Sequence, residues 1–209
     1  MSSAAASAGF RLATGHLGRG AQEALMAELA RIIEEAPFFR PRMPRTNKPF
    51  SVLMTNCGAL GWVADKESYR YQAIHPETGR PWPEMPALVR ELWAEFAPEA
   101  PPAEACLVNY YAPGSRMGLH QDRDEAELDA PVVSLSLGDT CVFRIGGTRR
   151  GDPTRSVRLS SGDVIVLGGE ARLAYHGVDR LIPGTSTLLG GYFPDGGRIN
   201  LTLRRVNPV

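Results

Sequence analysis

Short runs of alternating apolar and polar residues fill the second half of the chain, from Ala105 to Val206. Successive side chains of a β-strand point to opposite faces, so such runs predict strands. Glycine, aspartate, proline and serine separate the runs and favour turns. The predicted strands are ACLVNYYA, PVVSLSL, CVFRI, SVRLS, DVIVLGG, STLLGGYF and INLTLRRV. Five or more short strands at regular spacing indicate a β-sandwich or jelly roll rather than a parallel sheet of βαβ units.

Two helices are predicted ahead of these strands. Between Ala21 and Glu35, apolar residues recur at i, i+4, i+7 and i+8, which is the spacing of an amphipathic helix. Residues Met85 to Phe96 also gather their apolar side chains on one side, and prolines follow both segments. We therefore expect a mainly β protein with flanking helices, in which a jelly-roll core (a double-stranded β-helix) is buttressed by two N-terminal helices.

The segment between the helices has a basic part and an aromatic part. The basic part, residues 38–50, contains three prolines, which exclude a regular helix or a central strand. Its cations are Arg40, Arg42, Arg45 and Lys48. Such a loop can grip phosphates or can simply be solvated, and the sequence leaves both interpretations open. Beyond it, Ser51–Met54 is a short strand candidate, and Tyr69 and Tyr71 alternate with polar residues as two rings on one face of a strand.

Composition narrows the class of protein without naming an activity. A chain of 209 residues with 43% apolar residues is expected to form one globular domain, with a disordered tail up to about residue 9. The formal net charge is zero, so a nucleic-acid or anionic-membrane partner would need a local basic patch. Three separated cysteines without a CxxC argue against a disulfide framework and a zinc ribbon. With no predicted signal peptide or membrane span, we expect a soluble, cytoplasmic protein.

His120 and Asp122 are the first candidates for chemistry. Side chains two apart on a strand project from one face, roughly 6.6 Å apart, and these two could bind one metal ion from one side. A second histidine would complete the set of two histidines and one carboxylate that suits non-haem Fe(II) and leaves positions open for dioxygen. Because a lone HxD arises often by chance, a third ligand is needed before the motif indicates a metal site.

His176 is the candidate for that third ligand. His16 lies in the N-terminal arm and His75 precedes a proline in a turn, so neither is attractive. His176 follows a predicted strand at residues 172–175, several strands after Asp122, and a later jelly-roll strand can return beside an earlier one. Alone it would more often be a structural histidine. The upstream HxD in a strand-rich domain favours a ligand.

Residues 198–204 place four polar side chains on one face of a single strand. They are Arg198, Asn200, Thr202 and Arg204. This face is either the wet side of an edge strand or a cradle for a dicarboxylate, because guanidinium groups bind carboxylates bidentately. Asn109 and Tyr111, again two apart, could hydrogen-bond the same ligand.

With these residues, the sequence resembles the AlkB family of Fe(II)- and 2-oxoglutarate-dependent dioxygenases, of the bacterial type that repairs alkylated nucleic-acid bases. The matching segments are MTNCGALGW, RPWPEMP, CLVNYYAPGSRMGLHQDRDE, GDVIVLGGEARLAYHG and RINLTLR, in the family's order. The resemblance implies a dioxygenase domain at residues 51–209, with a nucleotide-recognition segment at about 51–85. Residues 1–50 would pack on it as tail, helix and basic loop. Residues 177–197 depart from the pattern by their length, which leaves the local hairpin open.

The resemblance also implies roles for individual residues. Iron would be bound by His120, Asp122 and His176. The co-substrate 2-oxoglutarate would be surrounded by Asn109, Tyr110, Tyr111, Arg198, Asn200, Thr202 and Arg204. The nucleotide would be lined by Trp62, Tyr69, Arg70, Tyr71, Asp124 and Arg150. In this scheme Trp62 stacks on one side of the damaged base and His120 lies on the other, while Asp124 faces the positive charge of the alkylated ring.

The implied activity is oxidative demethylation of bases such as 1-methyladenine and 3-methylcytosine in DNA or RNA. Dioxygen and 2-oxoglutarate would be consumed, and succinate, CO2 and formaldehyde released. A stacked base cannot reach the iron, so the target must be flipped out. A local basic rim would then hold the strand, formed by Arg40, Arg42, Arg45, Lys48, Arg149 and Arg150. A single-site monomer with no membrane partner is expected.

Two other functions stay open at this point. One keeps the 2-oxoglutarate-dependent hydroxylase but gives it a protein side chain or a small molecule as substrate. The other is a non-catalytic jelly-roll binding module whose metal is structural or absent. The aromatic set at Trp62, Tyr69 and Tyr71 speaks against the first. The polar face that begins at Arg198 has no explanation in the second.

Overall fold

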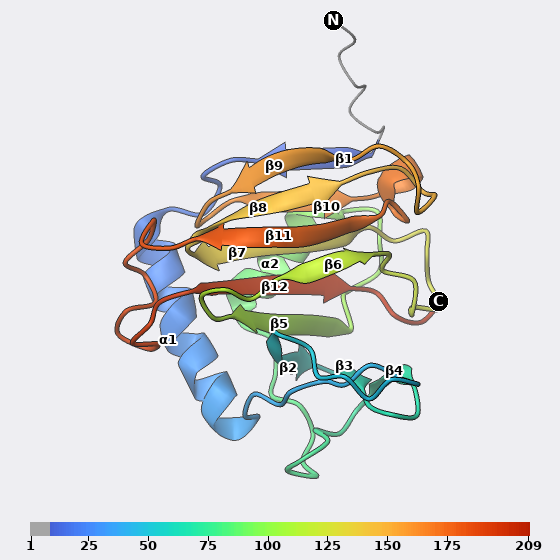
Figure 1. The fold of residues 1–209 in the computed structure, drawn as a ribbon. Helices are drawn as coiled ribbons and strands as arrows, with labels where there is room; N and C mark the ends of the chain where they lie inside the picture. The colour runs from blue at the N-terminus through green and yellow to red at the C-terminus, as the bar shows by residue number, and fades with distance from the viewer. Residues whose placement is uncertain (1–8) are drawn as a thin grey trace, which may run out of the picture.

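Two β-sheets face each other in the computed structural model, which describes residues 9–209 (Figure 1). The larger sheet has the strand order β1 (Phe10–Ala13), β10 (Val164–Leu167), β7 (Val132–Gly138), β12 (Arg198–Arg204), β5 (Ala105–Tyr111) and β2 (Leu53–Gly58). The smaller sheet has the order β6 (Met117–His120), β11 (His176–Ile182), β8 (Thr140–Ile145) and β9 (Arg155–Leu159). The strands of both sheets pair antiparallel. The predicted jelly-roll core is confirmed.

Two helices, α1 (Arg19–Glu35) and α2 (Ala87–Phe96), cover the outer face of the larger sheet (Figure 1). Leu25 and Leu29 of α1 are fully buried and belong to the same core cluster as Val108 of β5 and Leu201 of β12. Each fully buried leucine in such an interface contributes roughly 1.5–3 kcal/mol to stability. Both predicted helices are therefore confirmed, and they brace the sheet from behind. A 3₁₀ turn, η1 (Gly169–Ala171), completes the helical elements of the described residues.

The central position of β12 decides between the two interpretations of its polar face. This strand pairs with β5 on one side and β7 on the other, and all seven of its residues are buried. Ile199, Leu201 and Leu203 pack toward the helices. The opposite side chains, from Arg198 to Arg204, therefore lie between the two sheets. The edge-strand interpretation is wrong, because no side of β12 faces water.

A separate two-stranded hairpin stands beside the larger sheet. It consists of β3 (Gly61–Ala64) and β4 (Tyr69–Gln72), with Trp62 opposite Tyr71 in the register. The hairpin follows directly on β2, so the chain leaves the larger sheet and returns to it through α2 and β5. In Figure 1 it projects from the lower end of the sandwich.

The predicted strand STLLGGYF is wrong. Residues 183–197 form a chain of turns between β11 and β12. The carboxylate of Asp139 organises them, since it accepts hydrogen bonds from the backbone N–H groups of Thr185, Ser186 and Gly197. Leu188 and Leu189 of this segment are buried without a strand, and the ring of Phe193 stacks on that of Tyr110 at 4.2 Å. The apolar character of this segment therefore reflects packing against the core, not strand pairing.

Smaller differences concern where strands begin. The predicted strand at residues 172–175 is instead a run of turns, and His176 is the first residue of β11. The side chain of Arg172 is buried and donates to the carbonyls of Ala130 and Asp122, which fixes these turns. The candidate at Ser51–Met54 starts later, as β2. The predicted tail lies almost wholly outside the described residues, and among residues 9–209 no helix is long and apolar enough to cross a bilayer.

Candidate active site

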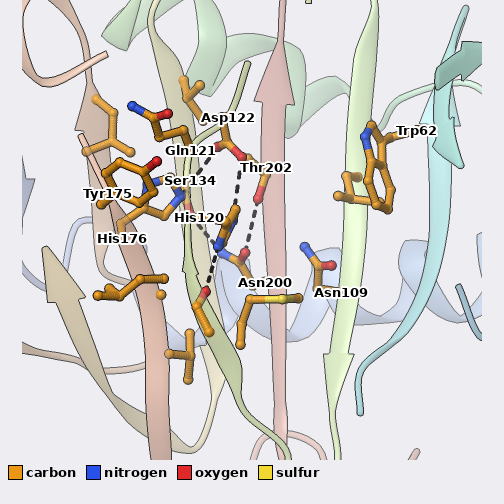
Figure 2. A pocket seen from close by; sticks show the side chains of 18 of the residues that line it. Trp62, Asn109, His120, Gln121, Asp122, Ser134, Tyr175, His176, Asn200 and Thr202 are labelled. Atoms are coloured by element: carbon orange, nitrogen blue, oxygen red, sulfur yellow. Dashed lines mark hydrogen bonds and ion pairs between the residues drawn. The ribbon is translucent and has the colours of Figure 1, made fainter. Parts of the chain in front are cut away.

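A cavity of about 850 Å³ opens between the two sheets at the end where β6 and β11 meet. Both sheets contribute to it, and Figure 2 shows their side chains converging from β5, β6, β11 and β12. Hydrophobic residues such as Leu107, Phe143 and Ile165 line its walls, while polar groups are concentrated on β12 and beside His120. A mainly apolar pocket with a few convergent polar groups is typical of a small-molecule site.

His120, Asp122 and His176 meet in this cavity (Figure 2). His120 ends β6 and is the register partner of His176, so strand pairing alone brings the two imidazoles together. One ligand atom from each of the three residues lies within 4.8 Å of the others. The Nε2 atoms of His120 and His176 lie 3.6 and 3.5 Å from the two oxygens of Asp122. The structure thus assembles the three ligands that the sequence nominated.

The second nitrogen of each imidazole has a backbone partner. Nδ1 of His120 lies 2.9 Å from the carbonyl of Gly118, and Nδ1 of His176 lies 2.9 Å from that of Ala174. A carbonyl accepts, so Nδ1 carries the proton and Nε2 offers its lone pair toward Asp122. Gly177 allows β11 to lie close to β6, because a Cβ there would lie 2.6 Å from the carbonyl oxygen of Met117.

The protonation states also suit metal binding. Burial, reinforced by repulsion from His176, lowers the pKa of His120 to about 4, so its imidazole is neutral at pH 7. Burial alone would raise the pKa of Asp122, but the Arg204 guanidinium and the two histidines hold it well below its usual range. A neutral imidazole and an ionised carboxylate are the forms that ligate metals.

Arg204 stands at the centre of a buried charge network. Its Nη2 lies 2.9 Å from Asp122 Oδ2, and its Nη1 donates to Glu125 Oε1 and to the hydroxyl of Tyr71, both at 2.9 Å. Glu125 also pairs with Arg172 at 3.1 Å. All four charged groups are buried, and pairing of this kind is what makes buried charge tolerable. The network fixes the turn that follows β6.

Arg198 differs, because most of its guanidinium has no protein partner. Its side chain is 2% exposed, its Nη2 donates to Ser136 Oγ at 2.9 Å, and its plane lies over the ring of Tyr111. Within residues 9–209, Nε and Nη1 of Arg198, Nε of Arg204 and Oδ1 of Asn109 are buried without a hydrogen-bond partner. Unpaired buried groups of this kind are costly, and three donors facing one cavity fit the carboxylates of a small dianion.

Comparison with known proteins identifies the family. The sequence profile of the 2OG-Fe(II) oxygenase superfamily matches residues 9–204. The chain belongs to this superfamily. An AlkB homologue from Caulobacter vibrioides (strain NA1000 / CB15N), named as an alpha-ketoglutarate-dependent dioxygenase, is 57% identical over 198 residues, or 94% of this chain and 87% of the relative. This similarity makes the chain an AlkB-type oxygenase.

Two further comparisons agree. The Arabidopsis thaliana protein ALKBH1C, named as a DNA N(6)-methyladenine demethylase, is 32% identical across 82% of this chain and 42% of its own length. The solved structure of OsALKBH1 superposes with a TM-score of 0.73 at 30% identity, covering 94% of this chain and 98% of that one. The shared architecture thus extends over nearly the whole chain.

An AlkB-type oxygenase uses Fe(II), 2-oxoglutarate and dioxygen, and the residues present fit these groups. His120, Asp122 and His176 would hold the iron, since they form the facial set of two imidazoles and one carboxylate. Arg198 would receive a carboxylate of 2-oxoglutarate, because two of its buried nitrogens lack a partner within the described residues, against one in Arg204. Asn200 and Thr202 also line the cavity, but they bond chiefly to the protein.

On the other side of the iron ligands, the cavity is lined by Trp62, Tyr69, Asp124 and Arg150. The indole Nε1 of Trp62 donates to Asp124 Oδ2 at 2.8 Å, and Tyr69 stacks on the indole at 5.5 Å. Figure 2 shows Trp62 on the far side of the cavity from His176. The guanidinium of Arg150 lies 5.2 Å over the ring of Tyr175 at the opposite wall. An aromatic slot with one carboxylate thus borders the iron site.

Three residues that the resemblance implied do not reach the cavity. Tyr110 points to the helix side of β5, where its hydroxyl donates to the carbonyl of Gly196, so it cannot contact 2-oxoglutarate. Arg70 turns away from the slot and pairs with Asp65 at 2.8 Å. Tyr71 lies behind the cavity wall in the charge network. Strand alternation explains the first two, since each side chain is on the wrong face.

Most cations of the predicted basic rim do not line the cavity. Arg40 and Arg42 donate to backbone carbonyls of their own loop, and Arg149 pairs with Asp152. Of the six cations, only Arg45 and Arg150 line the cavity. Arg45 stands there with a positive φ of 68°, at the tip of the folded loop.

Sequence reasoning overlooked three residues that support the site. Ser134 and Ser136 on β7 hydrogen-bond Asn200 and Arg198, and the alternation in VVSLSL would have placed both on one face. Glu125 follows Asp124 in the central motif, yet only the fold reveals its contacts with two arginines.

Proposed function

We propose that the chain removes N-methyl groups from damaged bases such as 1-methyladenine and 3-methylcytosine in DNA or RNA. The observation that carries this proposal is the aromatic slot of Trp62 and Asp124 beside His120. An alkylated ring is flat and cationic, so an indole face and a carboxylate both favour it over a neutral base. The named activity of the Arabidopsis relative, a DNA demethylase, supports a nucleic-acid substrate.

Bound iron, with dioxygen and 2-oxoglutarate, supplies the oxidising power that hydroxylates the methyl group while 2-oxoglutarate becomes succinate and CO2. The chain's own residues orient the reactants. Arg198 holds the co-substrate carboxylate, and Trp62 and Asp124 hold the flipped base with its ring beside His120. The apolar walls exclude water from the reaction. The hydroxymethylated base then releases formaldehyde and is restored.

The direct test offers a 1-methyladenine oligonucleotide with Fe(II), 2-oxoglutarate and oxygen, and measures formaldehyde and succinate together. We expect equal amounts of both, from single- and double-stranded substrates compared in parallel. Succinate without formaldehyde from any methylated oligonucleotide would contradict the proposal and favour a hydroxylase of proteins or small molecules. An anaerobic visible charge-transfer band with Fe(II) and 2-oxoglutarate would separate both enzymes from a binding module.

Replacing Trp62 by alanine should separate the two binding sites. Loss of one base–aromatic stack costs about 1–3 kcal/mol, so KM for the oligonucleotide should rise roughly five- to 150-fold. The affinity for 2-oxoglutarate should stay unchanged, because the indole of Trp62 contacts Asp124, Tyr69 and Phe50, none of which is a proposed co-substrate ligand. Tyr192, an exposed aromatic residue outside the cavity, is the matched control as Tyr192→Ala. An equal loss of both affinities in the Trp62 variant would point to a structural role.

We also propose that the protein acts as a single-site monomer in the cytoplasm, and that residues 51–85 recognise the nucleotide. A cavity whose lining residues all come from one chain supports the monomer. Arg45 and Arg150 at the cavity mouth would contact phosphates. Light scattering of the purified protein tests the monomer, and a mass of two chains would contradict it.

A further inference from the structure

Two successive carboxylates clasp the β3–β4 hairpin to the turn that carries the iron ligand Asp122. Trp62 on β3 donates its indole N–H to Asp124 at 2.8 Å, and Tyr71 on β4 donates its hydroxyl to Glu125 at 2.5 Å. Trp62 and Tyr71 are register partners across the hairpin. Both strands of the hairpin are therefore held, at the same level, by neighbouring residues of one turn.

The Tyr71 hydroxyl has a second partner on the co-substrate side. Its oxygen accepts a hydrogen bond from Arg204 Nη1 at 2.9 Å, and that nitrogen also donates to Glu125. The other end of the guanidinium, Nη2, pairs with Asp122. Burial raises the pKa of Tyr71 far above its usual value, so the hydroxyl keeps the proton that it donates. The hydroxyl thus joins the hairpin to the arginine beside the iron carboxylate.

We propose that Tyr71 is a positioning residue for Arg204, and that it couples the co-substrate site to the nucleotide-side hairpin. Tyr71 and Glu125 hold one end of the guanidinium, which leaves Nε, buried and without a partner within the described residues, free for a ligand in the cavity. Without the hydroxyl, Arg204 can turn fully onto Asp122 and Glu125. Because coupling is reciprocal, 2-oxoglutarate should in turn steady the hairpin.

The test is Tyr71→Phe, which removes one hydroxyl and keeps the buried ring. Calorimetry with Mn(II) in place of Fe(II) measures the Kd for 2-oxoglutarate without turnover. We expect Kd to rise about five- to tenfold, which corresponds to the loss of one hydrogen bond of ordinary strength. Tyr192→Phe removes an exposed hydroxyl outside the cavity and should leave this Kd unchanged. A wild-type Kd in Tyr71→Phe would overturn the proposal.

A double-mutant cycle separates positioning from a general loss of packing. If Tyr71 acts through Arg204, its hydroxyl should matter less than about twofold in an Arg204→Lys background. The same five- to tenfold penalty in both backgrounds would indicate a purely structural role and overturn the proposal. This cycle remains informative even if Tyr71→Phe lowers the melting temperature.

Hydrogen exchange tests the coupling from the hairpin's side. Saturating 2-oxoglutarate should slow amide exchange of residues 61–72 in the wild type, and this protection should shrink in Tyr71→Phe. If 2-oxoglutarate leaves the amide exchange of the hairpin unchanged in the wild type, the coupling is overturned. The inference rests on the family's co-substrate alone, so a failure to demethylate nucleic acid would leave all three measurements valid.

Discussion

Replacing Asp122 by alanine is expected to lower metal affinity at least about 100-fold and to abolish turnover. Changes to groups that only orient a metal ligand already cost about 10–100-fold, and Asp122 would be the sole anionic ligand of the site. Among residues 9–209, Asp122 is the one acid that groups with the two imidazoles as a possible metal site, so no other acid is placed to replace it. Titration with Mn(II), followed by calorimetry, measures the loss directly.

The same variant should stay folded. Arg204 loses one partner but keeps Glu125 and the Tyr71 hydroxyl, and Arg172 binds the backbone carbonyl of residue 122 rather than its side chain. His16→Ala is the matched control, because His16 pairs with Glu95 outside the cavity and should leave metal affinity unchanged. Retention of one tightly bound Mn(II) per chain in Asp122→Ala would remove this residue from the ligand set.

Local patterns predicted the parts of the fold that are amphipathic. The alternation in INLTLRRV is explicit because β12 separates a helix-facing core from a polar cavity, and each face selects one residue type. The short strands β1, β3 and β6 escaped prediction, as did β11, whose mixed sequence HGVDRLI carries no clear period. STLLGGYF failed for the opposite reason. Its apolar residues satisfy the core while Asp139 captures the backbone N–H groups that a strand would pair.

The candidate iron ligands were accessible to sequence reasoning because HxD is a local motif and His176 is the one histidine that follows it. Contacts between distant segments were not. Glu125 contacts Arg172 and Arg204 only in the folded chain, because the three residues come from distant segments. Tyr71 contacts Glu125 from the β3–β4 hairpin. Tyr110 was placed on the wrong face of its strand. Because Tyr110 and Tyr111 are adjacent, only one of them can line the cavity. In the basic loop, Arg40 and Arg42 donate hydrogen bonds to nearby backbone carbonyls.

Arg198→Met should abolish tight binding of 2-oxoglutarate and yet stabilise the protein without it. Removing one partner of a buried charged pair costs about 2–5 kcal/mol, so Kd should rise roughly 30- to several-thousand-fold. Arg198→Lys keeps the charge but loses the planar guanidinium, so its Kd should lie between those of the wild type and Arg198→Met. Arg180→Met, at an exposed arginine, is the control that should leave Kd unchanged.

The gain in stability follows from the same burial. Arg198 is 2% exposed, and two of its nitrogens lack a partner within the described residues, so the fold carries a poorly compensated charge until the co-substrate arrives. Methionine keeps an apolar stem but removes that charge, and comparable replacements stabilise by about 1–4 kcal/mol. For a chain of this size the melting temperature without 2-oxoglutarate should rise by about 2 °C or more. A lower melting temperature in Arg198→Met would mean that the guanidinium is already satisfied by the protein, and that the carboxylate of 2-oxoglutarate binds elsewhere.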